Sequence, residues 1–206
     1  MRVLSPGFVA ALLTMAALEL ACAQAPEPPV VAERPKEWAV PLQVEGVPNL
    51  YRVDTNLYRS AQPSALGMRN LEKLGVRTVI DLRTFHSDRD ELAGTALLND
   101  SLDMKAWHIE DEDVVGALRL LCDEEKGPFL VHCQQGADRT GVVCAMYRVV
   151  VQGWTKDAAI KEMVDGGYGF HPFWKSIVRY VRDADVDRVR REVQATSPAG
   201  PTRAAP

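Results

Sequence analysis

The residues best suited to chemistry in this chain are a cysteine and an arginine six positions apart. Cys133 follows the apolar run 129–131, which is typical of a buried strand, and Arg139 precedes a second apolar run, 142–151. The valines of the second run would also suit a strand, but its length and the intervening residues favour a helix. A loop that leads into a helix directs backbone N–H groups inward, and the helix dipole favours negative charge there. The stretch 131–141 therefore predicts an anion cradle that stabilises both a thiolate and a bound phosphate.

Four further residues complete a longer pattern around this pair, because residues 132–141 read His-Cys-Gln-Gln-Gly-Ala-Asp-Arg-Thr-Gly. The pattern resembles the signature of the cysteine-dependent protein tyrosine phosphatase superfamily. Segments 57–64 and 75–83 are similar to segments of its bacterial dual-specificity-like members, and the similarity covers about residues 48–182. The resemblance implies an α/β fold with a central four- or five-stranded, mostly parallel sheet flanked by helices, as in phosphotyrosine protein phosphatases.

The resemblance also implies hydrolysis of phosphomonoesters through a phosphocysteine intermediate. Cys133 would attack phosphorus as a thiolate, and Arg139 would hold two phosphate oxygens in a bidentate fork that lysine does not reproduce. His132 would order the loop through hydrogen bonds, and the Thr140 hydroxyl would donate to the sulfur. The residues expected around the phosphate are His132, Gln134, Gln135, Gly136, Ala137 and Thr140. No metal or other cofactor is expected, because the cradle itself supplies positive charge.

Two loops offer a proton donor for the leaving oxygen, and the sequence leaves the choice open. Asp138 lies inside the cradle, where some members of the superfamily also carry an aspartate, but the adjacent Arg139 guanidinium opposes its protonation. Asp111 and Asp113 lie 22 and 20 residues before Cys133 in an acidic loop. N-capping of the next helix would explain that acidic loop equally well. We rank Asp138 ahead of Asp111, with Asp113 third.

The variable positions of the loop bear on the substrate. Gln134, Gln135 and Ala137 are neutral, whereas phosphatases of inositol polyphosphates and phosphoinositides commonly carry lysine in this loop. We therefore expect a phosphorylated protein or a small phosphomonoester, with phosphotyrosine first and phosphoserine or phosphothreonine next. The alternatives are an inositol phosphate or phosphoinositide phosphatase and, in another class, a non-catalytic phosphate-binding module. Arg59 and Arg83 would either form structural ion pairs or line the pocket rim.

Composition and the N-terminus limit the cellular setting. The 206 residues suit one well-buried domain, and a net charge of −4 without a basic run argues against nucleic-acid binding. Arg2 precedes the apolar run 8–18, and Ala-Cys-Ala at 21–23 offers a cleavage site. We predict a signal peptide over 1–23 and an exported protein, periplasmic or secreted, with no stable membrane span in the mature chain. A retained N-terminal anchor, or lipidation at Cys22, is the alternative.

The rest of the chain divides into three expected parts: a proline-rich linker over 24–47, a phosphatase domain over 48–193 and a disordered tail over 194–206. Removal of the signal segment leaves three cysteines, and this odd number indicates at least one free thiol. Cys122 and Cys144 lie on apolar helical stretches and are expected in the core.

Hydrophobic periodicity predicts alternating strands and helices, which supports the α/β class. Strands are expected at 49–53, 57–59, 76–82, 102–109 and 129–131. Helices are expected at 64–74 and 89–98, from the acidic loop 110–113 to residue 122, and at 142–151, 155–164 and 172–182. The last helix is expected to continue as a charged, solvated segment over 183–193.

Overall fold

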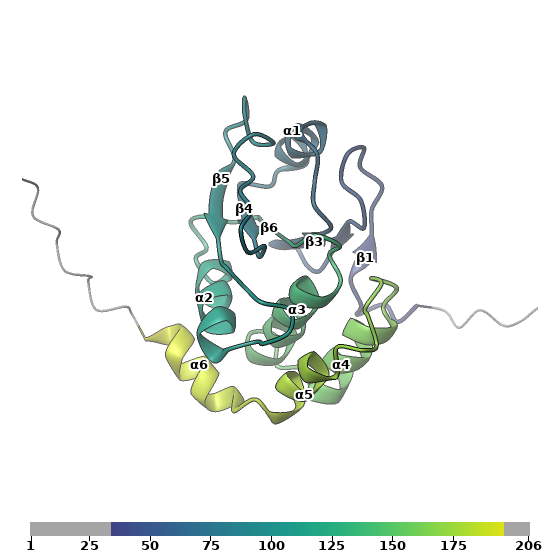
Figure 1. The fold of residues 1–206 in the computed structure, drawn as a ribbon, viewed down its shortest axis with the longest axis vertical. Coiled ribbons are helices and arrows are strands. Elements are labelled where there is room, and N and C mark those ends of the chain that lie inside the picture. The colour runs from purple at the N-terminus through teal and green to yellow at the C-terminus, as the bar shows by residue number, and fades with distance from the viewer. Residues whose placement is uncertain (1–33, 196–206) are drawn as a thin grey trace, which may run out of the picture. The chain divides into compact units, whose positions relative to one another are not determined.

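Successive side chains of a strand point to opposite faces of a sheet, and this chain uses that alternation to build two apolar cores. In strand β6 (Phe129–His132), Phe129 and Val131 belong to one core and Leu130 to the other, all three being fully buried. The smaller core lies under helix α1, whereas the larger core lies under the other helices (Figure 1). Both faces of the sheet are therefore covered, as expected for parallel strands.

Six strands form the sheet in the order β1-β2-β3-β6-β4-β5. They are β1 Val40–Pro41, β2 Tyr51–Arg52, β3 Leu57–Ser60, β4 Thr78–Asp81, β5 Leu98–Ser101 and β6 Phe129–His132. Strands β3, β6, β4 and β5 are parallel, and β2 and β1 extend the sheet with antiparallel pairs. The mostly parallel α/β sheet is confirmed. It has one strand more than the upper limit we predicted, because β1 has only two residues and carries too little pattern to be recognised.

This computed structural model describes residues 34–195, and it contains six helices in that range. They are α1 Ala65–Leu74, α2 Asp111–Leu121, α3 Asp138–Val150, α4 Lys156–Asp165, α5 Lys175–Asp183 and α6 Val186–Gln194. The predicted boundaries of α1 are confirmed, since the Ser64 hydroxyl caps its first turn and Gly75 ends it in a left-handed conformation with φ 98°. Within the described range, no helix is long and apolar enough to cross a membrane.

Two predicted elements before α2 are wrong. The expected helix over 89–98 is a series of turns, and the strand expected over 102–109 lies earlier, at β5 (Leu98–Ser101). Strand β5 forms an edge of the sheet and is mostly exposed, with Asn99 and Asp100 at its centre. An exposed edge strand needs no apolar alternation, so hydrophobic periodicity does not detect it.

The second half of the expected linker belongs to the domain instead. The Arg34 guanidinium donates to the carbonyl oxygen of Gly166 at 2.7 Å and to the Tyr168 hydroxyl at 3.0 Å, and Ala39 is buried. The expected signal segment, the first part of the linker and positions 196–206 of the expected tail lie outside the described residues.

The charged C-terminal continuation is also less solvated than expected. It forms α6, which begins after a break at Ala184 and Asp185, and Val189 on this helix is buried in the larger core. The Arg119 side chain of α2 donates to the carbonyl oxygen of Glu192 at 2.6 Å. A single apolar face therefore attaches an otherwise charged helix to the domain.

Candidate active site

The loop expected to bind phosphate starts where parallel strands end together. His132, the last residue of β6, pairs with Ser60 at the end of β3 and with Asp81 at the end of β4. The chain then passes through residues 133–137 into α3, whose first helical residue is Asp138. In open α/β sheets, ligands bind outside the carboxyl ends of the strands, and this loop occupies that place.

The backbone of the loop is turned so that its carbonyl groups face the protein. The Gln134 carbonyl accepts from the Gln62 backbone N–H at 3.4 Å, and the Gln135 carbonyl accepts from the Asn49 side chain at 2.9 Å. Within the described chain, the N–H groups of residues 134–137 donate no hydrogen bond. Four adjacent free N–H groups at the start of a helix form a site for an anion.

The Arg59 side chain supports this loop through a hydrogen bond to its backbone. It is buried, donates to the Gly136 carbonyl oxygen at 2.7 Å and stacks on the Tyr168 ring at 3.6 Å from the ring centroid. Gly136 has φ 69°, and a Cβ there would lie 2.5 Å from backbone atoms of Ser60 and Ala61. Glycine is therefore required at this turn. Arg59 takes neither of its two expected roles, since it forms no ion pair within the described chain and does not line the cavity over the loop.

A cavity of about 350 Å³ opens over the loop. Its lining residues are Ala106, Cys133, Gln134, Gln135, Asp138, Arg139, His171, Phe173 and Trp174. Cys133 is buried at its base, and the Arg139 guanidinium makes one long hydrogen bond, 3.3 Å to the Leu82 carbonyl oxygen. The structure thus brings together a thiol, a guanidinium whose N–H donors are mostly without a partner in the described chain, and free backbone N–H groups. These groups can bind a phosphate and stabilise a thiolate beside it.

Asp138 lines the cavity, as the first-ranked proton donor should, but it has a partner that the sequence did not indicate. One carboxylate oxygen accepts from the His171 backbone N–H at 3.0 Å, and the other lies 2.8 Å from the His171 ring Nδ1. His171 comes from the segment between α4 and α5, far along the chain from the loop. Its position in a segment with three glycines, directly before Pro172, is the only sequence feature that sets it apart.

Asp111, the second-ranked donor, lies outside the residues that line the cavity. Its two carboxylate oxygens are taken by the Tyr180 hydroxyl at 2.9 Å and by the Arg188 guanidinium at 2.7 Å. Asp113 accepts from the Glu110 backbone N–H at 3.4 Å in the capping box of α2, which agrees with the capping explanation of the acidic loop. The acidic residues at the start of α2 therefore organise the helix start and its contacts with α5 and α6.

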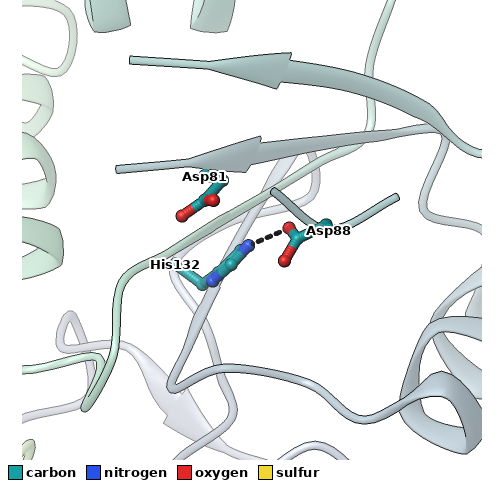
Figure 2. A group of neighbouring side chains, drawn as sticks. All are labelled: Asp81, Asp88 and His132. Atoms are coloured by element: carbon teal, nitrogen blue, oxygen red, sulfur yellow. Dashed lines mark hydrogen bonds and ion pairs between the residues drawn. The ribbon is translucent and has the colours of Figure 1, made fainter. Parts of the chain in front are cut away.

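His132 is fully buried behind the loop, and its Nε2 lies 2.7 Å from the Asp88 carboxylate. Figure 2 shows its imidazole between the carboxyl groups of Asp81 and Asp88. Burial alone would raise the pKa of Asp88, but hydrogen bonds and charge from His132, with a hydrogen bond from Gln62, leave it below its ordinary value. Burial raises the pKa of Asp81, whose Oδ2 has no partner in the described chain. His132 therefore acts on the loop indirectly. It contacts Asp88, Asp88 accepts a hydrogen bond from the Gln62 side chain, and the Gln62 backbone N–H donates to the Gln134 carbonyl oxygen in the loop.

Two groups of side chains in the described chain are close enough to hold a metal ion: Asp81 with Asp88 and His132, and Asp88 with His86 and Glu91. Asp88 is common to both, and its oxygens already contact His132, Gln62 and His86. These contacts explain why Asp88 lies close to His132 and His86 without a metal ion.

The remaining cysteines differ from expectation in one case. Cys144 is buried in α3, and burial raises the pKa of its thiol to about 11. Cys122 is exposed rather than in the core, and it is the residue that directly follows α2. The Thr140 hydroxyl is buried without a hydrogen-bond partner, so the expected donation to the Cys133 sulfur is not formed in this structure.

Comparison with known proteins identifies the chain. Residues 47–165 match the tyrosine phosphatase family. The chain is 42% identical over 160 residues to the dual specificity protein phosphatase TpbA of Pseudomonas aeruginosa, an alignment that covers 77% of this chain and 72% of TpbA. Fold and site together define a cysteine-dependent phosphatase. More narrowly, the chain belongs to the tyrosine phosphatase family.

Solved structures and a plant relative extend the comparison. A crystal structure of P. aeruginosa TpbA, a cysteine-to-serine variant in complex with phosphotyrosine, matches with a TM-score of 0.71 and 39% identity. The match covers 79% of this chain and 99% of that one. Inositol diphosphatase DSP5 of Arabidopsis thaliana is 28% identical over 155 residues, 70% of this chain and 73% of DSP5.

Proposed function

We propose that this phosphatase hydrolyses phosphotyrosine in proteins or peptides, with phosphoserine and phosphothreonine as further substrates. The observation that carries the proposal is the loop of free backbone N–H groups closed by Cys133 and Arg139. Both side chains line one cavity with the start of α3, so one phosphate can contact all of them. The phosphotyrosine bound in the TpbA structure supports the same substrate here.

The chemistry follows from these groups. The Cys133 thiolate attacks phosphorus, the ester P–O bond breaks, and a phosphocysteine forms. The Arg139 guanidinium and the loop N–H groups stabilise the charge on the equatorial oxygens of the phosphoryl group. These donors are already in position before the reaction starts. Water then attacks the phosphocysteine, the S–P bond breaks, and phosphate leaves.

The wall of the cavity favours an aromatic alcohol. Phe173 and Trp174 lie on one side of it, and Phe173 is 67% exposed, so its ring can contact that of a bound tyrosine. Gln134 and Gln135, which also line the cavity, carry no charge. The cavity therefore offers one phosphate site beside an apolar surface.

An inositol phosphate or phosphoinositide substrate is the second candidate, supported by the relationship to inositol diphosphatase DSP5. Such substrates carry several phosphates, which require additional cations around the site. Arg59 is committed to Gly136 and Tyr168 under the loop, and Arg83 donates to the Gln62 side chain at 2.7 Å. Neither arginine lines the cavity, so the single-phosphate substrate is favoured.

Release of phosphate from a substrate panel tests the proposal. The panel contains a phosphotyrosine peptide, phosphoserine and phosphothreonine peptides, and inositol hexakisphosphate. The wild-type protein is expected to be fastest on phosphotyrosine, Cys133→Ser to be inactive, and Cys122→Ser, which replaces an exposed cysteine outside the cavity, to match the wild type. No turnover of any phosphomonoester, or undiminished turnover by Cys133→Ser, would leave only a phosphate-binding module. Fastest release from the inositol phosphate would favour the second candidate.

We further propose that the protein is exported and acts in the periplasm or outside the cell. Support comes from the charged residue, apolar run and Ala-Cys-Ala site within residues 1–23. N-terminal sequencing of the protein recovered from cell fractions tests this, with Gln24 expected as the first residue. A protein that still begins at Met1, or begins at a modified Cys22, would favour the membrane-anchored alternative.

A further inference from the structure

The proposed hydrolysis, on which this inference rests, needs a proton for the leaving oxygen. The titratable and charged side chains that line the cavity are Cys133, Asp138, Arg139 and His171. Cys133 must be a thiolate, and Arg139 stays charged at all relevant pH values. The choice of donor is thereby reduced to Asp138 and His171, which contact each other.

Asp138 is poorly placed to donate a proton itself. Both of its oxygens are occupied by His171, one by the backbone N–H at 3.0 Å and the other by the ring nitrogen at 2.8 Å. The carboxyl group is also the more buried partner, since its side chain is 11% exposed and that of His171 is 35% exposed. Both oxygens therefore serve as acceptors for His171, which leaves neither of them to donate to a leaving oxygen.

His171 has the complementary properties. We assign the ring hydrogen to Nδ1, because an Asp138 carboxylate oxygen lies 2.8 Å from it, and Nε2 is then the ring nitrogen available to a substrate. Nε2 has no hydrogen-bond partner in the described chain, and the ring packs against Phe173 on the cavity wall, with centroids 5.4 Å apart. A carboxylate behind an imidazole fixes the orientation of the ring and stabilises the imidazolium.

We propose that His171 is the catalytic proton donor and that Asp138 is its positioning residue. In the first step, Cys133 Sγ bonds to phosphorus, the P–O bond to the alcohol breaks, and the leaving oxygen takes the proton from His171 Nε2. In the second step, water gives a proton to the neutral Nε2 as it attacks phosphorus, and the S–P bond breaks. Phosphate leaves, and the thiolate and imidazolium are restored.

A pair of variants separates this arrangement from direct donation by Asp138. His171→Asn keeps a side-chain N–H near the position of Nδ1, so it can still hold Asp138, but it removes Nε2. Asp138→Asn keeps a hydrogen-bond acceptor for the ring but removes the charge. His108→Gln is the matched control, because the His108 side chain is 66% exposed and does not line the cavity.

The measurement is kcat for substrates with different leaving groups. For a phosphotyrosine peptide, His171→Asn is expected to lower kcat by about 10²-fold or more, the usual effect of losing a general acid. For dinitrophenyl phosphate, whose leaving oxygen needs no proton, we expect a loss of less than about ten-fold. Asp138→Asn should show the same dependence on leaving group with a smaller loss, and His108→Gln should match the wild type on both substrates.

Four results would overturn the inference. Retained phosphotyrosine turnover in His171→Asn with a large loss in Asp138→Asn would make Asp138 the donor. An equal loss on both substrates would give His171 a structural role only, and His171→Gln with thermal melts checks this if His171→Asn is unstable. A wild-type protein inactive on every phosphomonoester would refute the proposed function as well. Normal wild-type activity with an inactive Cys133→Ser and an unaffected His171→Asn would refute this inference alone.

Discussion

Two arginines on helix α3 have opposite environments, although they are only nine residues apart. Arg148 is buried and forms a bidentate pair with Glu162, with N–O distances of 2.8 and 2.9 Å. It also donates to the Gln152 side chain at 2.7 Å and stacks on the Trp154 ring at 4.3 Å from the centroid. Arg139 makes one hydrogen bond of 3.3 Å and lines an open cavity.

The difference separates a structural arginine from a functional one. All five N–H donors of the Arg148 guanidinium are used, so none is left for a ligand, and the pair with Glu162 ties α3 to α4. Within residues 34–195, Arg139 uses one donor for the Leu82 carbonyl oxygen and has the others free for a ligand. A planar fork of donors left unsatisfied beside a buried thiol is what a phosphate needs.

The cysteines of α3 and its preceding loop repeat this contrast. Cys144 lies inside α3, where burial raises the pKa of its thiol to about 11 and keeps it protonated and unreactive at neutral pH. Cys133 is also buried, but it lies at the open end of the helix beside free N–H groups and Arg139. Both thiols are buried, so what distinguishes the nucleophile Cys133 from the inert Cys144 is its position at the start of the helix rather than its exposure.

The largest expected effect is on stability, in Arg148→Leu. This change leaves the Glu162 carboxylate buried without its charge partner, which typically costs about 3–5 kcal/mol of unfolding free energy. Urea unfolding measures the loss, and Arg182→Leu, at an exposed arginine of α5, should stay within about 0.5 kcal/mol of the wild type. A loss below about 1 kcal/mol in Arg148→Leu would mean that the pair contributes little, as at exposed sites.

The next effect is on activity, in Arg139→Lys. Lysine keeps the charge but not the bidentate fork, and loss of one preorganised donor typically lowers kcat by about 10²–10³-fold. The unfolding free energy should change by no more than about 0.5 kcal/mol, because Arg139 makes only one long hydrogen bond. Phosphate release from a phosphotyrosine peptide measures the loss. Arg148→Lys should instead lose stability and retain its kcat at temperatures where it is folded, and the reverse pattern would contradict the assignment of the two arginines.

A smaller effect is expected in the dependence of stability on pH. Burial would raise the pKa of Glu162, but hydrogen bonds from Arg148, Ala39 and Tyr168 leave it below the ordinary value of 4.5. Glu162 therefore contributes stability that is fully present above the unfolded-state value and is lost as pH falls through the lower folded-state value. Urea unfolding from neutral pH down to acid should show a shallower loss for Glu162→Gln than for the wild type. Parallel curves for the two proteins would show that Glu162 is not responsible.

The smallest effect is expected for Asp111→Asn. Asp111 lies outside the cavity and pairs with the exposed Arg188, so we expect almost no loss of stability. Turnover of a phosphotyrosine peptide should stay within about two-fold of the wild type, whereas Asp138→Asn should lower it clearly. Equal losses of turnover in the two variants would return Asp111 to the list of proton donors.

Elements defined by contiguous apolar patterns were predicted well, and elements defined by their surroundings were not. Helix α1, with its Ser64 cap and Gly75 end, has all its signals within a short segment. Strand β5 does not, because one edge of it is unpaired and its side chains are mostly exposed. Cys122 was placed in the core for a related reason, since an apolar stretch does not reveal where its last residue turns outward.

The sequence by itself determined the loop, because its function depends on neighbours along the chain. Cys133, the turn at Gly136 and Arg139 fall within one strand–loop–helix segment, whose backbone supplies the N–H groups. Only the tertiary structure decided which side chains surround that loop. Arg59 under it, Asp88 behind it and His171 beside it come from three other segments, and pairs between distant segments leave no periodic trace in a single sequence.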